Sequence, residues 1–203
     1  MKENNWFDPF YIQSHLNEEE SNIQKNVRDF CNNELKPTVV ERNRKNEFDK
    51  ELYPKFGSLG VLGQTVKTHG GSGTSNLAYG LVAYEFEKID SSYRSSISVQ
   101  SSLVIHPINE FGSQEQKDKY LPQLIKGEKI GCFGLTESEA GSDPASMKTS
   151  FKKTKDGYIL NGSKNWITNA PIADIFIIWA IEENKDHKSI KGFIIEKNTE
   201  GLN

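Results

Sequence analysis

The stretch from residue 131 to residue 147, GCFGLTESEAGSDPASM, groups small and polar residues that could bind an anionic or polar ligand. Gly134, Thr136, Gly141 and Ser142 lie close together just after an expected strand. A loop of this kind offers backbone N–H groups and hydroxyls to a ligand without steric obstruction. A plain β-turn loop is the simpler explanation of the glycines alone. The spacing matches neither G-x-G-x-x-G nor a P-loop, so a Rossmann-type or NTPase site is not indicated.

A second candidate is GSKNWITN, residues 162–169. Trp166 offers a flat aromatic face, and Thr168, two residues on, is expected on the same side of a strand. Both could therefore contact one planar ligand. For this segment alone a buried core tryptophan is the favoured explanation. Two such loops in one domain favour a shared ligand.

A third candidate lies in EFEKIDSSYRSSISVQSS, residues 85–102, which places Glu87, Arg94 and Ser95 in or beside expected helices. An arginine among small residues needs a partner, and the fork of its guanidinium suits a carboxylate. Alternatively, Arg94 pairs with Glu87 and has no other role.

The elements expected before residue 124 are helical. Capping boxes are predicted at Asn17–Glu20 and Ser113–Gln116, each opening a helix. Further helices are expected over residues 48–62 and 77–89, and the small, apolar residues 93–111 predict a helix buried between others.

After Gly127 the pattern changes to short segments rich in Ile, Phe and Trp, which is typical of strands. Asp156-Gly157 and Asn161-Gly162 are turn or hairpin signals. The sequence thus predicts an α+β protein, with an all-helical domain over residues 1–127 and an incomplete antiparallel β domain over residues 128–203. The expected strands lie within residues 129–137, 157–168, 173–183 and 191–198.

Composition argues against several classes of protein. The formal net charge is −3, from 25 basic and 28 acidic residues, so neither nucleic acid nor a membrane surface is an expected partner. Cys31 and Cys132 match no metal-ligand spacing, and no metal is expected. The first twenty residues lack the features of a secretory or transit peptide. We expect a cytoplasmic protein, or a mitochondrial-matrix protein if the sequence is a mature organellar form.

Several motifs together resemble the acyl-CoA dehydrogenase family. GCFGLTESEAGSDPASM followed by NGSKNWITNAPIADIF is similar to its flavin-binding middle domain. LGVLG, then AYGLVAYEFEKIDSSYRSSISVQSSLVIHPI and EQKDKYLPQLIKGE, resemble the glutaryl-CoA dehydrogenases of that family. The resemblance extends from WFDPF to EKNTEGLN, with the motifs in the family's order.

The resemblance implies an FAD site. Thr136 would hydrogen-bond the flavin ring, Ser142 would lie where cofactor and acyl-CoA meet, and the Thr168 hydroxyl would approach flavin N5. The implied cofactor-binding residues are Phe133, Gly134, Leu135, Thr136, Gly141, Ser142, Trp166, Ile167 and Thr168.

The resemblance also implies a substrate and a reaction. Arg94 and Ser95 match residues that hold the distal carboxylate of glutaryl-CoA, with Glu87 orienting the arginine and Ser142 completing the substrate-binding set. The implied enzyme, an oxidoreductase acting on the CH–CH group, removes an α proton and transfers the β hydride to flavin. Loss of carbon dioxide then gives crotonyl-CoA. Electrons would pass to electron-transfer flavoprotein, and the full-length protein is expected to be a homotetramer.

Two departures from the family pattern matter. Ser138 stands where the family usually has proline. The family's catalytic glutamate lies in a C-terminal helical bundle that would follow Asn203, so no catalytic residue is expected in this chain. We therefore expect the 203 residues alone neither to turn over substrate nor to hold FAD tightly.

Other functions remain open at this stage. One is a non-catalytic module that binds a flavin or an acyl-CoA. Another is a dehydrogenase of a different short-chain acyl-CoA, or a glutaryl enzyme that does not decarboxylate.

Overall fold

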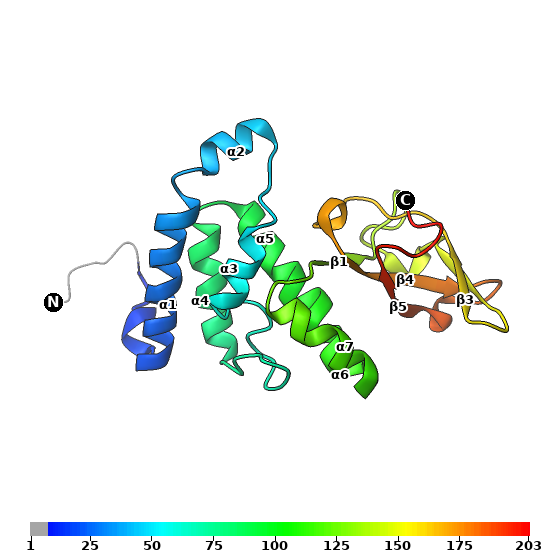
Figure 1. Cartoon of the computed structure of the whole chain (residues 1–203), viewed down its shortest axis with the longest axis horizontal. Helices are drawn as coiled ribbons and strands as arrows, with labels where there is room; N and C mark the ends of the chain where they lie inside the picture. Colours follow the sequence, from blue (N-terminus) through cyan, green and yellow to red (C-terminus); the bar gives the residue numbers. More distant parts are fainter. Residues whose placement is uncertain (1–7) are drawn as a thin grey trace.

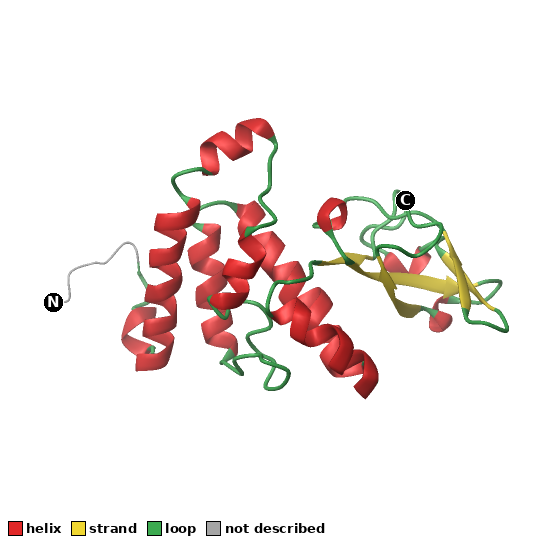
Figure 2. Ribbon diagram, viewed as in Figure 1, coloured by secondary structure: helices red, strands yellow, loops and turns green. Residues whose placement is uncertain are grey.

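Helices and strands are segregated along the chain (Figures 1 and 2). The computed structural model describes residues 8–203, so the first seven residues of the predicted helical domain, including the Trp6 and Phe7 of the family resemblance, lie outside the described residues. All the longer helices precede residue 126, and all five strands follow residue 130. The order of the two predicted parts is therefore confirmed.

Both predicted capping boxes are present, because each depends only on residues three positions apart. Asn17 Oδ1 accepts a hydrogen bond from the Glu20 N–H at 2.8 Å, and Glu20 Oε2 accepts one from the Asn17 N–H at 3.2 Å. Ser113 and Gln116 form the same reciprocal pair. The helical segments before the first strand are η1 (Ile12–His15), α1 (Glu18–Phe30), η2 (Cys31–Leu35), α2 (Val39–Lys45), α3 (Leu52–Ser58), α4 (Asn76–Glu87), α5 (Ser91–Ser98), η3 (Val99–Ile105), α6 (His106–Phe111) and α7 (Gln114–Ile125). Three single-turn helices lie among the strands: η4 (Pro144–Ser146), η5 (Ala170–Ile172) and η6 (His187–Ser189).

Two helix predictions need correction. The helix expected over residues 48–62 is shorter, since α3 begins at Leu52 and ends at Ser58, with Pro54 in its first turn. Pro54 lacks a backbone N–H, which is tolerated only where that group has no intrahelical partner. Helix α2 was not predicted, because VVERNRK has no apolar stripe and none of its residues is buried.

The core of the helical part is aliphatic and aromatic. Phe56 packs edge-on against Phe86 with ring centroids 5.3 Å apart, and Tyr53 lies beside Phe56 at 5.8 Å. Ile175 and Ile177 of the sheet belong to the same buried cluster. The helices and the sheet therefore share one core.

The sheet is mixed, and the antiparallel prediction is wrong for two of its four pairings. β1 (Gly131–Gly134) and β2 (Ser150–Lys153) both pair parallel with β4 (Ile175–Glu182). β3 (Tyr158–Asn161) pairs antiparallel with β2, and β5 (Lys191–Glu196) antiparallel with β4. The local turn signals identified the hairpin at Gly157, but parallel pairing needs a long crossover that no local signal encodes.

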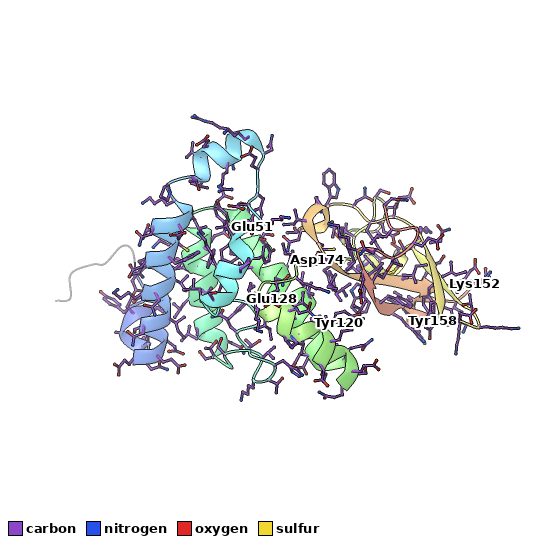
Figure 3. The ribbon with its side chains drawn as sticks, viewed as in Figure 1. Glu51, Tyr120, Glu128, Lys152, Tyr158 and Asp174 are labelled. Atoms are coloured by element: carbon purple, nitrogen blue, oxygen red, sulfur yellow. The ribbon has the colours of Figure 1, made fainter. Side chains whose placement is uncertain are left out.

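Polar contacts connect the helices to the sheet. The side chain of Gln100 in η3 accepts from the Gly131 N–H at 2.7 Å and donates to the carbonyls of Leu124 and Lys129, both at 2.9 Å. Tyr120 on α7, labelled in Figure 3, donates to Glu196 of β5 at 3.0 Å. Across residues 8–203, none of the helices has the length and apolarity needed to span a membrane.

Candidate ligand site

The loop after β1 is a tight turn followed by an open segment. The N–H of Glu137 donates to the carbonyl of Ala140 at 3.1 Å, and the N–H of Ala140 donates back at 3.2 Å. Gly141 and Ser142 then lie exposed, and a Cβ added at Gly141 would meet no atom within 4 Å. Thr136 and Leu135, at the start of the loop, are half-buried. The loop therefore exposes Gly141 and Ser142 to solvent, while Leu135 and Thr136 at its start are partly covered.

Trp166 is almost fully exposed, at 92%. Its φ of 59° and the φ of 71° at Asn169 are left-handed, so residues 162–169 leave the strand that ends at Asn161. The expectation that Trp166 and Thr168 share one side of a strand is therefore wrong, and so is the alternative of a core tryptophan. An exposed indole beside the exposed Thr168 and the half-buried Ile167 offers a flat apolar surface with a hydroxyl near it.

Direct hydrogen bonds join the two loops. The Asn165 N–H donates to the Thr136 carbonyl at 2.9 Å, and Lys164 Nζ donates to the Leu135 carbonyl at 3.0 Å. Lys164 Nζ also contacts Glu137 Oε1 at 2.7 Å. The predicted residues of the two loops therefore lie side by side.

Glu137 is an ionised, buried carboxylate. Burial opposes its ionisation, but hydrogen bonds from Lys164 and from the N–H groups of Lys148 and Thr149 outweigh that effect and lower the pKa of Glu137 to about 2. It therefore carries a full negative charge at neutral pH, opposite the Lys164 ammonium.

Phe133 and Gly134 lie in β1, below the loop. The Phe133 ring packs edge-on against Trp179 at 5.9 Å. At Gly134 a Cβ would meet Cδ1 of Ile178 at 2.5 Å and Cγ of Lys164 at 3.3 Å, so side chains from β4 and from the 162–169 segment both pack against the glycine. Gly134 therefore lies against the 162–169 segment, whereas Phe133 packs on β4.

Arg94 pairs with Glu87, as one of the two sequence interpretations predicts. The distance from Arg94 Nε to Glu87 Oε2 is 2.6 Å, and both side chains are partly exposed. Hydrogen bonds from Ser91 and Arg94 hold the pKa of Glu87 below its usual range. Among the described residues, neither terminal nitrogen of Arg94 has a hydrogen-bond or ion-pair partner. Two terminal nitrogens with four N–H donors therefore remain available, beside the half-buried Ser95.

A residue that sequence reasoning missed connects this helix to the loops. Asn169 Oδ1 accepts from the Ser96 hydroxyl at 3.0 Å, and Asn169 Nδ2 donates to the Gly131 carbonyl at 3.1 Å. The helix that includes Arg94 thus meets the end of the 162–169 segment. Glu137 and Lys164 were missed as well, although Lys164 is the single charged residue of GSKNWITN and could have been singled out on that ground. No group of potential metal ligands was found in the described range.

Comparison with known protein families gives two matches. Residues 17–128 match the family described as acyl-CoA dehydrogenase, N-terminal domain. Residues 132–203 match acyl-CoA dehydrogenase, middle domain. The change between the two matches falls close to the change from helices to strands.

Individual relatives are similar over nearly the whole chain. A short-chain specific acyl-CoA dehydrogenase of Clostridium acetobutylicum is 40% identical over 189 residues, covering 92% of this chain and 50% of that protein. The structure of a glutaryl-CoA dehydrogenase from Mycobacterium smegmatis in complex with FADH2 is 41% identical, with a TM-score of 0.91, covering 96% of this chain and 49% of the other.

A third similar chain belongs to a structure titled for the electron transferring flavoprotein of Acidaminococcus fermentans. It is 37% identical, with a TM-score of 0.85, covering 92% of this chain and 50% of the other. The present chain spans about half the length of the relatives it matches.

Proposed function

The chain belongs to the acyl-CoA dehydrogenase family, and we propose that it forms the N-terminal and middle domains of an FAD-dependent enzyme that oxidises an acyl-CoA at a CH–CH bond. The observation that best supports this function is that two loops are hydrogen-bonded to each other and that one of them carries an exposed indole. Trp166, Thr136 and Thr168 supply an aromatic face and two hydroxyls at one place.

The chemistry of these residues fits FAD. A flavin has a planar ring with polar edges, so it needs an apolar face and neutral hydrogen-bonding groups more than a charged pocket. The exposed indole of Trp166 meets the first need, and the hydroxyls of Thr136 and Thr168 meet the second. The charges beneath the loops, Glu137 and Lys164, pair with each other and leave no net charge there.

The bound FAD would supply the hydride acceptor. The residues of this chain would bind the cofactor and orient it relative to the substrate. Trp166, Ile167 and Thr168 would hold the ring, while Gly141 and Ser142 would let the cofactor and the thioester approach the same backbone. Phe133 and Gly134 would support the loops from β1.

For the substrate we propose glutaryl-CoA. Within residues 8–203 the two terminal nitrogens of Arg94 have no partner, and an arginine fork binds a carboxylate through two parallel hydrogen bonds. Glu87 holds the guanidinium from the Nε side, which fixes its orientation. A substrate with a distal carboxylate would use this cation, and a plain fatty acyl chain would not. Electron-transfer flavoprotein as acceptor, and a homotetramer, are the partners we propose for the whole protein.

A substrate comparison tests the proposal. The native polypeptide that contains this sequence would be purified with its flavin and assayed by dye reduction with glutaryl-CoA and valeryl-CoA, which have equal chain lengths and differ in the distal carboxylate. We expect a higher kcat/KM for glutaryl-CoA. Absence of bound flavin would contradict the family function, and bound flavin without turnover would favour a non-catalytic binding module.

A different short-chain substrate is the second candidate. It is favoured by the 40% identity to a short-chain specific relative, close to the 41% identity to the glutaryl enzyme. In that case valeryl-CoA would be oxidised at least as well as glutaryl-CoA, and Arg94 would pair only with Glu87.

A further inference from the structure

The two ligand loops emerge from strands that do not pair with each other. β1, which precedes the 135–142 loop, pairs with β4, whereas β3, which precedes the 162–169 loop, pairs with β2. In the sheet order β1-β4-β2-β3 two strands lie between them, so no direct ladder joins the two strands that the loops follow. Three contacts join the loops, all between residues 135–137 and residues 164–165.

Two of these three contacts are made by one ammonium group. Lys164 Nζ binds the Leu135 carbonyl and the Glu137 carboxylate, on either side of Thr136. Glu137 in turn accepts from the N–H groups of Lys148 at 2.6 Å and Thr149 at 2.9 Å. The pair thus connects the two loops to the start of β2.

Stability alone does not explain this pair. Each side chain is only 7% exposed, and taking two charges out of water costs about as much as their attraction returns. Apolar side chains of the same volume would stabilise a fold at least as well. A buried ion pair does restrict geometry, because its hydrogen bonds permit few arrangements of the groups that they join.

We propose, resting on the FAD-binding function above, that the buried Glu137–Lys164 pair is a positioning device that holds Thr136 and Trp166 at the separation the cofactor requires. Lys164 holds the Leu135 carbonyl, just before Thr136, and the carboxylate of Glu137, just after it. The N–H groups of Lys148 and Thr149 hold Glu137 from the other side. Because Lys164 lies two residues before Trp166, the same anchor limits where the indole can lie. The two residues act through Thr136 and Trp166 and need not touch the cofactor.

Two variants of the native, full-length polypeptide test this role. Lys164→Met keeps the aliphatic stem over Gly134 and removes the ammonium. The double variant Glu137→Gln/Lys164→Met also removes the charge that would otherwise be buried alone, and the amide oxygen keeps an acceptor for one of the two backbone N–H groups. Each apoprotein would be titrated with FAD by quenching of flavin fluorescence, with the melting temperature of the apoprotein as a second measurement.

We expect the double variant to recover most of the melting temperature but to bind FAD at least about tenfold more weakly than the wild type. The visible circular dichroism of the bound flavin should change as well. Glu85→Gln is the matched control, since Glu85 is also a buried acid held by Arg28 and Lys88 but lies in the helical part. It should lower stability and leave FAD affinity unchanged.

The outcomes are distinguishable. A wild type that does not bind FAD would refute the proposed function itself. A wild type that binds FAD, together with a double variant that binds it equally tightly, would refute only the positioning role. Equal loss of affinity in Glu85→Gln would also refute it, because the effect would then be general destabilisation. If Lys164→Met does not fold, the double variant still decides between these results.

Discussion

The Ser96 hydroxyl on α5 donates a hydrogen bond to Asn169 Oδ1 across 3.0 Å, although the two residues are 73 positions apart in the chain. Ser96 also lies 2.6 Å from the Tyr53 hydroxyl, and Asn169 donates to the Gly131 carbonyl. One short polar chain therefore runs from α3 through α5 to the start of the sheet. It brings the helix of Arg94 against the segment of Trp166.

Replacing Asn169 with glycine should show how much this link contributes to the free energy of unfolding. Glycine accepts the φ of 71° without strain, so the change removes only the side-chain hydrogen bonds. We expect the free energy of unfolding to fall by about 1–3 kcal/mol in denaturant titration. Asn46→Gly is the matched control, since Asn46 has a φ of 54° at the end of α2 and is exposed. Equal losses in the two variants would contradict the link.

Replacing Arg94 with alanine should change substrate choice more than catalysis. Loss of a charged hydrogen-bonding group to the distal carboxylate should lower kcat/KM for glutaryl-CoA by about ten- to a hundredfold. The value for valeryl-CoA should change by less than about threefold. Arg94→Lys keeps the charge without the fork, so its kcat/KM for glutaryl-CoA should lie between the values of the wild type and Arg94→Ala. An unchanged preference in Arg94→Ala would show that the arginine has no role beyond Glu87.

Gly162 should tolerate no side chain. A Cβ there would lie 2.6 Å from Cα and 2.7 Å from Cβ of Thr149, and φ is 151°. Gly157 has a similar φ of 141° but open space around it. Gly157→Ala should therefore cost only the conformational strain, about 1–3 kcal/mol. Gly162→Ala should cost clearly more in the same unfolding measurement, and similar costs would mean that Thr149 can move away.

The lowered pKa of Glu137 predicts an acid-sensitive fold. Its folded pKa of about 2 lies below the usual unfolded value of roughly 4.3, so ionised Glu137 stabilises the protein fully above the unfolded value. That contribution is lost progressively as the pH falls from about 4.3 toward about 2. Unfolding measured across this range should have a weaker pH dependence in Glu137→Gln than in the wild type. Parallel curves would exclude the ion pair as the cause.

Local chemistry accounts for what the sequence predicted correctly. The capping boxes at Asn17 and Ser113 and the turn at Gly157 each depend on neighbours within a few residues, so their physics is visible in a short window. The order of helices before strands follows from the change in period after Gly127. The motif resemblance then identified the family, because several motifs occur in the right order.

Long-range partners account for what could not be predicted. β4 pairs with β1, β2 and β5, and its two parallel partners are distant in sequence: Gly131 pairs with Ile175 and Ser150 with Ile181. No alternation pattern specifies such parallel neighbours. Trp166 was expected on a strand because the segment 157–168 is short and rich in residues that favour strands. The strand ends at Asn161 instead, and Trp166 and Asn169 are left-handed in the segment beyond it. The partners that hold this segment, Leu135, Thr136 and Ser96, lie outside the sequence window.

Gln100 makes the connection between the two family domains rigid. Its amide side chain binds the carbonyls of Leu124 and Lys129 and the N–H of Gly131, and so fixes the whole connection from α7 to β1. A connector pinned at both ends to a third segment cannot bend as a hinge does. A change of position in the sheet would therefore move η3 and α5 with it, and the two domains should melt as one cooperative unit.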